Sequence, residues 1–137
     1  MIWKLFQTGK STAAEYAPHV RGRAAEQMAL RHLEQHGLRL LTRNFRCTRG
    51  EIDLIMQHGD TVVFVEVRSR RSDAYGSGAA SVGARKQAKL NAAANIYLQQ
   101  HAALSNCPCR FDVVALSFSS DPPQLDWIPD AFSEAHF

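Results

Sequence analysis

Two carboxylates in strand-like segments are the first candidates for chemistry in this sequence. Asp53 lies in an apolar segment over residues 51–57, and Glu66 lies in a second one over residues 61–68. The Gly59-Asp60 pair between them is a favoured two-residue turn, which predicts an antiparallel hairpin. With that turn Asp53 stands directly opposite Glu66, because side chains alternate along each strand. A four-residue loop would keep both on one face with an offset, and a three-residue loop would separate them.

If Asp53 and Glu66 face each other, their negative charges repel, and a nearby cation would stabilise them. Directly opposed residues hold their Cβ atoms about 4.5–5.5 Å apart, where like charges destabilise a hairpin. Mg²⁺ or Mn²⁺ would meet that demand, since hard divalent cations prefer carboxylate oxygens. The same register places Glu51 opposite Arg68, so the alternative is a solvated polar face with a surface ion pair. Three apolar residues share the face and favour a site over plain surface: Ile55, Val62 and Phe64.

Glu26 is a third acidic candidate, on an expected amphipathic helix over residues 22–36 that Gly37 ends. It lies on the same helical stripe as three apolar residues, so it would point toward the sheet. The alternative is an acid in the first turn that the helix dipole favours. The apolar stripe consists of Ala29, Leu30 and Leu33.

Helices interspersed with strands give an α/β pattern, which predicts a mixed central sheet with helices on both faces. The other expected segments are a strand over 38–45, a turn over 46–50, a polar loop over 69–81, a helix over 82–101, a strand over 110–117 and, after Pro122-Pro123, a last strand over 124–128. The tail would add a helical turn. No repeat or linker divides the chain, so we expect one domain over residues 1–137, with a lead-in over 1–20, a core over 21–118 and a C-terminal strand and tail over 119–137.

The composition is that of a globular chain, with 137 residues of which 45% are hydrophobic and 21% are charged. This length can bury a core without disulfides or a structural metal. No run of about 18 apolar residues is present, and no signal-peptide core precedes a cleavage site, so we expect a cytoplasmic protein. The cysteines Cys47, Cys107 and Cys109 lack a second ligand pair at zinc spacing, and we expect reduced thiols.

Basic residues bracket the acidic segments, although the net charge of +3 is by itself a weak indicator. Arg39, Arg43, Arg46 and Arg49 precede Glu51, and a second basic group begins at Arg68 and follows Glu66. This layout is expected where a phosphate backbone approaches a bound metal ion. The candidates for binding nucleic acid in the second group are Arg70, Arg85, Lys86 and Lys89.

Several motifs, in this order over about residues 20–118, resemble the bacterial YraN-like family. They are Gly22-Arg23-Ala24-Ala25-Glu26, Arg43-Asn44-Phe45, Gly50-Glu51-Ile52-Asp53-Leu54-Ile55, Val63-Phe64-Val65-Glu66-Val67-Arg68, Lys86 and Phe111-Asp112-Val113-Val114. That family is similar to the restriction-endonuclease-like, or PD-(D/E)xK, superfamily, and to archaeal-type Holliday-junction resolvases in particular. The resemblance implies a restriction-endonuclease-like three-layer fold with an acidic helix residue, an Asp and a Glu-x-Lys strand. These positions carry over to Glu26, Asp53 and Glu66-Val67-Arg68.

Two positions depart from the pattern that the resemblance implies. Arg68 stands where the superfamily has lysine, and Ala25 stands where the family has glycine. Arginine is always protonated, so Arg68 could stabilise phosphate charge but could not act as a base. Lys86 or Lys89, on the second helix, could supply a lysine that has migrated, and the alternative for each is an ordinary surface lysine.

The leading hypothesis is a metal-dependent nuclease that hydrolyses phosphodiester bonds of DNA. Asp53, Glu66 and the Val67 carbonyl would hold Mg²⁺ or Mn²⁺, with Glu26 acting through water or a second metal ion. Arg68 would stabilise the developing charge, with Glu51 orienting it. Backbone contacts carry no sequence information, so we expect selectivity for a structure such as branched or flapped DNA, as in repair or recombination.

Two other hypotheses come from different classes of function. A non-catalytic module that grips DNA or RNA through a degenerate nuclease site is supported by Arg68 in the lysine position. A protein–protein adaptor would use the aromatic ends of the chain, although the same aromatics could close the core or form a homodimer. These aromatic residues are Trp3, Phe6, Trp127 and Phe132.

Overall fold

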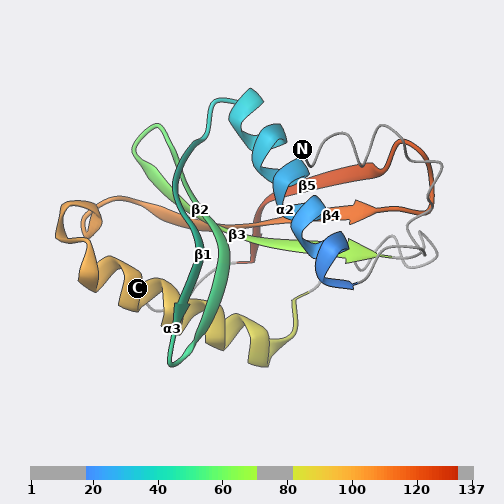
Figure 1. Cartoon of the computed structure of the whole chain (residues 1–137). Coiled ribbons are helices and arrows are strands. Elements are labelled where there is room, and N and C mark those ends of the chain that lie inside the picture. Colours follow the sequence, from blue (N-terminus) through green and yellow to red (C-terminus); the bar gives the residue numbers. More distant parts are fainter. Residues whose placement is uncertain (1–17, 71–81, 133–137) are drawn as a thin grey trace.

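The computed structural model of this chain describes residues 18–70 and 82–132 and contains two α-helices and a five-stranded sheet (Figure 1). The strand order is β1-β2-β3-β4-β5, and only β3 and β4 run parallel to each other. The expected mixed α/β sheet is therefore confirmed. The elements are α2 (Pro18–Gln35), β1 (Arg39–Cys47), β2 (Gly50–His58), β3 (Thr61–Arg70), α3 (Ala84–Gln100), a 3₁₀ turn η3 (Ala102–Leu104), β4 (Cys109–Ser117) and β5 (Gln124–Phe132).

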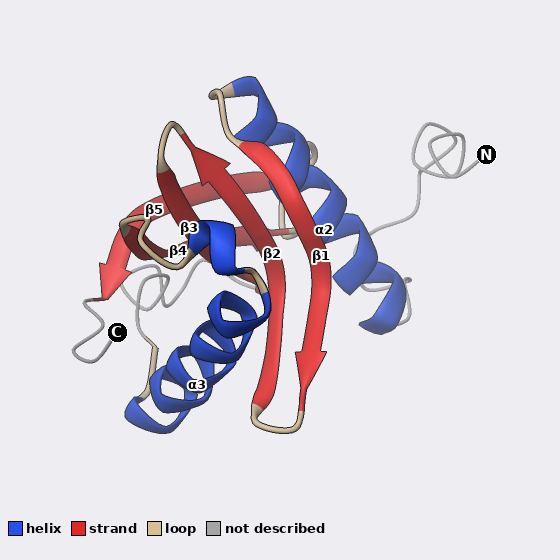
Figure 2. Ribbon diagram, turned by 90° about the vertical axis from the view of Figure 1, so that its left-hand side faces the viewer, coloured by secondary structure: helices blue, strands red, loops and turns tan. Residues whose placement is uncertain are grey.

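The two helices cover opposite faces of the sheet, as Figures 1 and 2 show. Alternating residues of β3 separate the two layers, since Val63 and Val65 pack under α2 while Val62 and Phe64 pack under α3. The apolar stripe expected on α2 is buried against its layer, and it consists of Ala29, Leu30 and Leu33. The α3 side of the second layer consists of Leu90, Ala93, Ala94 and Tyr97. No helix within the described ranges is long and apolar enough to span a membrane.

The β2–β3 hairpin has the two-residue turn expected from Gly59-Asp60, and His58 pairs with Thr61. Gly59 takes a positive φ of 63°, a conformation that glycine adopts without the steric cost of a Cβ. Ladder pairing between β2 and β3 continues only as far as Leu54 and Val65. Beyond that pair the two strands are no longer joined by regular pairing, and the acidic residues lie at this point.

Several element boundaries differ from the sequence expectations. The first helix begins at Pro18, because proline fits the first turn of a helix, where its missing N–H is not needed. β1 continues to Cys47, so the expected five-residue turn over 46–50 is wrong and only Thr48 and Arg49 connect the strands. The expected helical turn after the last strand is also wrong as far as residue 132, because β5 continues to Phe132. Ser69 and Arg70 belong to β3, and the rest of the expected loop over 69–81 lies outside the described residues up to Ser81.

Asp112 is a fully buried carboxylate that joins β4 to β5. It forms an ion pair with Arg110 at 3.0 Å and accepts hydrogen bonds from the Trp127 indole and the Asp130 backbone N–H, both at 2.9 Å. Asp130 has a positive φ of 51°, and the β4–β5 register shifts between Phe111 and Val113. The carboxylate therefore satisfies polar groups that an irregular strand pairing would leave without partners.

The aromatic residues of β5 pack onto the core. Trp127 contacts the rings of His32 and His36 edge-on, with centroids 5.8 and 5.5 Å away, and Phe132 stacks on Phe111 at 4.8 Å. These contacts favour closure of the core over an exposed adaptor surface at this end. Trp3 and Phe6 lie outside the described residues.

Candidate metal centre

At Asp53 the side chains of β2 stop alternating regularly between the layer under α2 and the layer under α3. Leu54 and Met56 pack under α2 and Ile55 packs under α3, as strand alternation requires. Ile52, however, also packs under α3, so the alternation breaks between Ile52 and Leu54. The break coincides with the end of β2–β3 pairing, and it places the Asp53 carboxylate between the two helical layers.

Asn44 lies on β1 at the level of this break. The pairs Arg43–Leu54 and Phe45–Ile52 flank it, which leaves Asn44 beside Asp53. Its backbone has a positive φ of 52°, a region that asparagine tolerates better than most residues with a Cβ. With its amide nitrogen turned toward α2, Asn44 donates hydrogen bonds to both carboxylate oxygens of Glu26 at 3.2 Å.

Glu26 is held close to the Asp53 carboxylate by this contact. Burial raises the pKa of Glu26 and the charges of Asp53 and Glu51 raise it further, while the Asn44 amide and Arg43 oppose the rise. The sequence expectation that Glu26 points toward the sheet is therefore confirmed. The sequence analysis gave Asn44 no role at the site. An asparagine inside a strand is unusual, and this could have indicated a special position.

Asp53 and Glu66 approach each other beyond the last regular pair of the hairpin. The Val67 backbone N–H donates to Asp53 Oδ2 at 2.8 Å, so the Asp53 side chain takes a hydrogen bond that a ladder carbonyl would otherwise accept. The two carboxyl groups also lie close enough for the charge of Asp53 to raise the pKa of Glu66. The two acids therefore lie close together, as the predicted hairpin register implies. Their contact is made through side chains rather than through continued strand pairing.

The pKa values of both acids rise because the carboxyl groups are buried together. Desolvation raises the pKa of Glu66 to about 7, the Asp53 charge and their shared hydrogen bond contribute in the same direction, and Lys86 and Arg68 oppose the rise. Burial likewise raises the pKa of Asp53, against the hydrogen bond from Val67. The closeness of the two carboxyl groups therefore disfavours the state in which both are ionised.

Lys86 is the lysine that reaches the acidic pair. Its Nζ lies 3.5 Å from Glu66 Oε2, and the Glu66 side chain is only 12% exposed. The contact crosses from α3 to β3, because alternation places Glu66 on the α3 face with Val62 and Phe64. Arg68 also lies near enough for its charge to lower the pKa of Glu66.

Glu51 has a different partner from the one expected. Its carboxylate pairs with Arg46, its cross-strand partner on β1, with Oε2 and the Arg46 Nε 3.4 Å apart. The register that would set Glu51 opposite Arg68 ends three residues earlier, at the Leu54–Val65 pair. The ion pair with Arg46 does not test whether Glu51 also orients Arg68, and that expectation stays a prediction.

The remaining basic candidates lie on α3 and at the end of β3. Lys89 lines a pocket at the β1–β2 turn, and Arg85 is exposed in the first turn of α3. Arg70 is the last residue of β3, and its side chain lies outside the described part of the chain.

The donor set fits a small hard cation held partly by water. Asp53 and Glu66 offer carboxylate oxygens, and Mg²⁺ binds through one or two carboxylates while keeping several waters. Within residues 18–70 and 82–132, no three side chains of the His, Cys, Asp and Glu types lie together closely enough to hold a metal ion directly. Glu26, bonded to Asn44, therefore belongs to the surroundings of the acidic pair rather than to its direct ligands.

Comparison with known proteins identifies the family of this chain. Residues 25–116 match the family described as "Uncharacterised protein family UPF0102". The chain belongs to the UPF0102 family. A UPF0102 protein of Ectopseudomonas mendocina is 55% identical over 111 residues, which cover 81% of this chain and 92% of the relative. UPF0102 proteins of Stutzerimonas stutzeri and Pseudomonas aeruginosa strain PAO1 are 54% and 52% identical, over 81% and 82% of this chain and 92% and 91% of their own lengths. The matched region contains Glu26, Asp53, Glu66 and Lys86, so the whole acidic centre lies within the UPF0102 part of the chain.

Proposed function

We propose that this UPF0102 protein is a Mg²⁺- or Mn²⁺-dependent nuclease of restriction-endonuclease-like fold that hydrolyses phosphodiester bonds of DNA. The observation that carries the proposal is the half-buried pair of Asp53 and Glu66, whose charges act on each other at a point where strand pairing ends. A structural role alone would favour one carboxyl with a matched cation. Two acids with raised pKa values beside one close lysine would suit a divalent cation, whose binding favours the ionised form of both carboxyl groups.

Asp53, Glu66 and the Val67 carbonyl are the residues that would hold the cation. When bound, the ion would activate a water molecule as nucleophile and neutralise charge on the scissile phosphate. The Val67 backbone N–H already fixes the Asp53 carboxylate at 2.8 Å, so this acid needs little reorganisation before it binds. An orientation fixed in advance lowers the entropic cost of forming the site.

Lys86 and Arg68 would divide the work of the single lysine in the Glu-x-Lys pattern. Lys86, at 3.5 Å from Glu66, lies where an amine can hold or donate a proton beside the reacting phosphate. Arg68 stays protonated and supplies positive charge to the phosphoryl oxygens. The proposal therefore assigns the lysine function to α3 rather than to β3.

Glu26 would act beside the direct ligands. Its carboxylate is oriented by Asn44, and its pKa is raised by burial and by Asp53. Such a group can accept a hydrogen bond from a water molecule next to the acidic pair. DNA is the proposed substrate rather than RNA, and branched or flapped forms would be preferred if the basic residues contact the backbone, because such contacts carry no sequence information.

The test is cleavage of a panel of branched, flapped and single-stranded DNA with Mg²⁺ or Mn²⁺. We expect wild-type cleavage that EDTA abolishes, and at least about a 100-fold loss in Asp53→Asn/Glu66→Gln. Glu34→Gln, a change at an exposed glutamate of α2, is the matched control and should cleave like wild type. Equal cleavage by the double variant and wild type would overturn the proposal. Calorimetric titration with Mn²⁺ of the same three proteins reports on metal binding independently of turnover.

A second candidate is a nucleic-acid-binding module that does not cut. The Lys86–Glu66 ion pair favours it, because a lysine can neutralise the acid without a metal ion. This candidate predicts salt-dependent DNA binding, no heat of Mn²⁺ binding and no cleavage of any substrate in the panel.

A further inference from the structure

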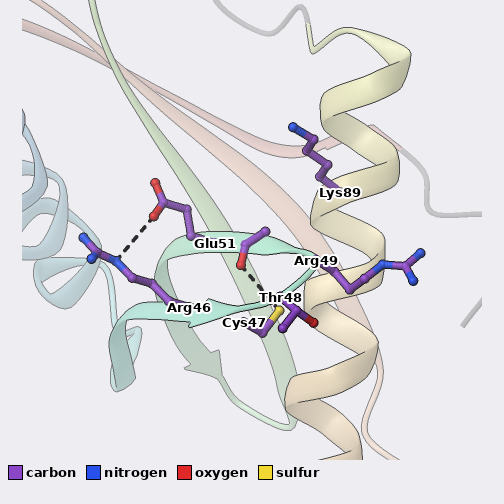
Figure 3. A pocket seen from close by; sticks show the side chains of 7 residues that line it. Arg46, Cys47, Thr48, Arg49, Glu51 and Lys89 are labelled. Atoms are coloured by element: carbon purple, nitrogen blue, oxygen red, sulfur yellow. Dashed lines mark hydrogen bonds and ion pairs between the residues drawn. The ribbon is translucent and has the colours of Figure 1, made fainter.

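An open pocket of about 390 Å³ lies between the β1–β2 turn and α3, to one side of the acidic centre. Figure 3 shows the turn lying against the helix. The lining residues are Arg46, Cys47, Thr48, Arg49, Gly50, Glu51 and Lys89.

The shape of the pocket depends on close packing at Gly50. A Cβ at this position would lie 3.4 Å from both the Cβ and the carbonyl oxygen of Lys89, so the strand end fits tightly against α3. The Cys47 thiol donates to the Gly50 carbonyl at 3.4 Å and closes the base of the turn. The turn is therefore a formed feature that presents Thr48 and Arg49 outward.

The pocket carries an excess of positive charge. Arg46 and Glu51 neutralise each other, with side chains 78% and 58% exposed. Arg49 and Lys89 are exposed, and neither forms an ion pair with any residue that the structure describes. Two cations and the Thr48 hydroxyl are thus available to an anionic ligand.

The direction of the two cations indicates the kind of anion. In Figure 3 Arg49 extends from the turn to the right across α3, whereas Lys89 projects from the helix to the left, above the turn. Side chains that diverge do not clamp a single small anion. They suit a ligand that repeats its charge along its length, as a phosphodiester backbone does.

Two residues connect the pocket to the acidic centre. Glu51 lines the pocket, and its charge raises the pKa values of both Glu26 and Asp53. Lys89 follows Lys86 by three positions on α3, so the two lysines lie on neighbouring turns of one helix face. An extended strand could therefore contact the pocket and the acidic pair together.

We propose that this pocket is a backbone-binding subsite, in which Arg49 and Lys89 contact successive phosphates of a nucleic acid strand beside the one at Asp53 and Glu66. The inference rests on the proposed function, because it takes the acidic pair as the place of the scissile phosphate. The subsite fixes the path of the strand across the β1–β2 turn. It also assigns to this turn a positioning role that the acidic centre does not supply.

The experiment is binding of a short labelled DNA duplex, measured by fluorescence anisotropy in EDTA over about 50 to about 200 mM salt. Arg49→Gln/Lys89→Gln removes two phosphate contacts, so the slope of log K against log salt should fall by about 1.8. Arg23→Gln/Arg31→Gln is the matched control, because it removes the same charge from two exposed residues of α2 outside the pocket. Its slope should stay within about 0.5 of the wild-type value.

Three outcomes would overturn the subsite. One is an equal loss of slope in the pocket and control variants, and another is no loss in the pocket variant. The third is competition by inorganic phosphate that exceeds its ionic-strength effect in wild type but not in the pocket variant, which would indicate a site for a free anion. Titration with Mn²⁺ separates this result from the proposed function, since the pocket variant should bind the metal like wild type. If wild type binds no Mn²⁺ and cuts nothing, the nuclease fails even where the slope result supports the pocket.

Discussion

Replacing Glu66 by glutamine should change how the stability of the metal-free protein depends on pH. The pKa of Glu66 is about 7 in the folded protein and 4.5 as an ordinary glutamate. The folded state therefore binds this proton about 300-fold more tightly than the unfolded chain, which corresponds to about 3.4 kcal/mol. Because the pKa is raised on folding, this stabilisation is present at low pH and is lost as pH rises through about 7.

The magnitude follows from the two protonation equilibria. Between about pH 5 and about pH 8, Glu66 should cost the wild-type protein about 2.5 kcal/mol of unfolding free energy. Glutamine keeps the size of the side chain and cannot ionise. Over the same pH range the unfolding free energy of Glu66→Gln should therefore fall by about 2.5 kcal/mol less than that of wild type. At about pH 8 the variant should be the more stable protein, although it lacks the ion pair with Lys86.

Urea unfolding in EDTA at several pH values measures the effect, with Glu34→Gln as the exposed control whose curve should follow wild type. Mn²⁺ at about 100 times its dissociation constant should then restore about 2.7 kcal/mol to wild type at about pH 8 and much less to Glu66→Gln. Parallel pH curves for wild type and Glu66→Gln would refute the reasoning, because they would show that the acid is not buried against Asp53.

Three further variants test separate parts of the structure. Lys86→Gln removes the cation that lowers the pKa of Glu66, so the pH-dependent loss of stability should move to higher pH, and DNA cleavage should fall about 100-fold. Asp112→Asn weakens a fully buried network that includes Trp127, and it should cost about 3 kcal/mol in urea unfolding while Mn²⁺ affinity stays the same. Gly59→Ala forces a Cβ into a backbone with a φ of 63° and should cost about 1 kcal/mol.

Each of these has a result that would contradict it. A shift of the pH curve to lower pH in Lys86→Gln would mean that the lysine does not stabilise the ionised acid. Loss of Mn²⁺ binding by a folded Asp112→Asn protein would extend the metal site to β4. An unfolding free energy unchanged by Gly59→Ala would show that the hairpin turn tolerates a side chain.

The hairpin and the first helix are the parts of the fold that local sequence patterns predicted well. The turn at Gly59-Asp60 and the pairing of His58 with Thr61 could be predicted, because a two-residue turn fixes the register of the strands that it joins. The burial of the α2 stripe followed from its helical spacing. Turn chemistry and periodicity act between residues close in the chain, so they can be read without knowledge of the fold.

The partners of the acidic residues depended on the tertiary structure. Glu51 pairs with Arg46 because β1 lies along the other side of β2, and Asn44 reaches Glu26 because β1 turns through a positive φ at that point. Neither the neighbouring strand nor its local twist is encoded in the spacing of residues along one hairpin.

The sequence by itself predicted that Asp53 and Glu66 lie close together, since one two-residue turn fixes the register of the hairpin as far as the neighbouring Leu54–Val65 pair. Only the tertiary structure decided that pairing would stop before them, that Asp53 would bond the Val67 backbone, and that a lysine from α3 would reach Glu66. The physical reason is that these contacts depend on sheet twist and on the packing of a helix far along the chain. Both follow from burial of the whole core rather than from local preference.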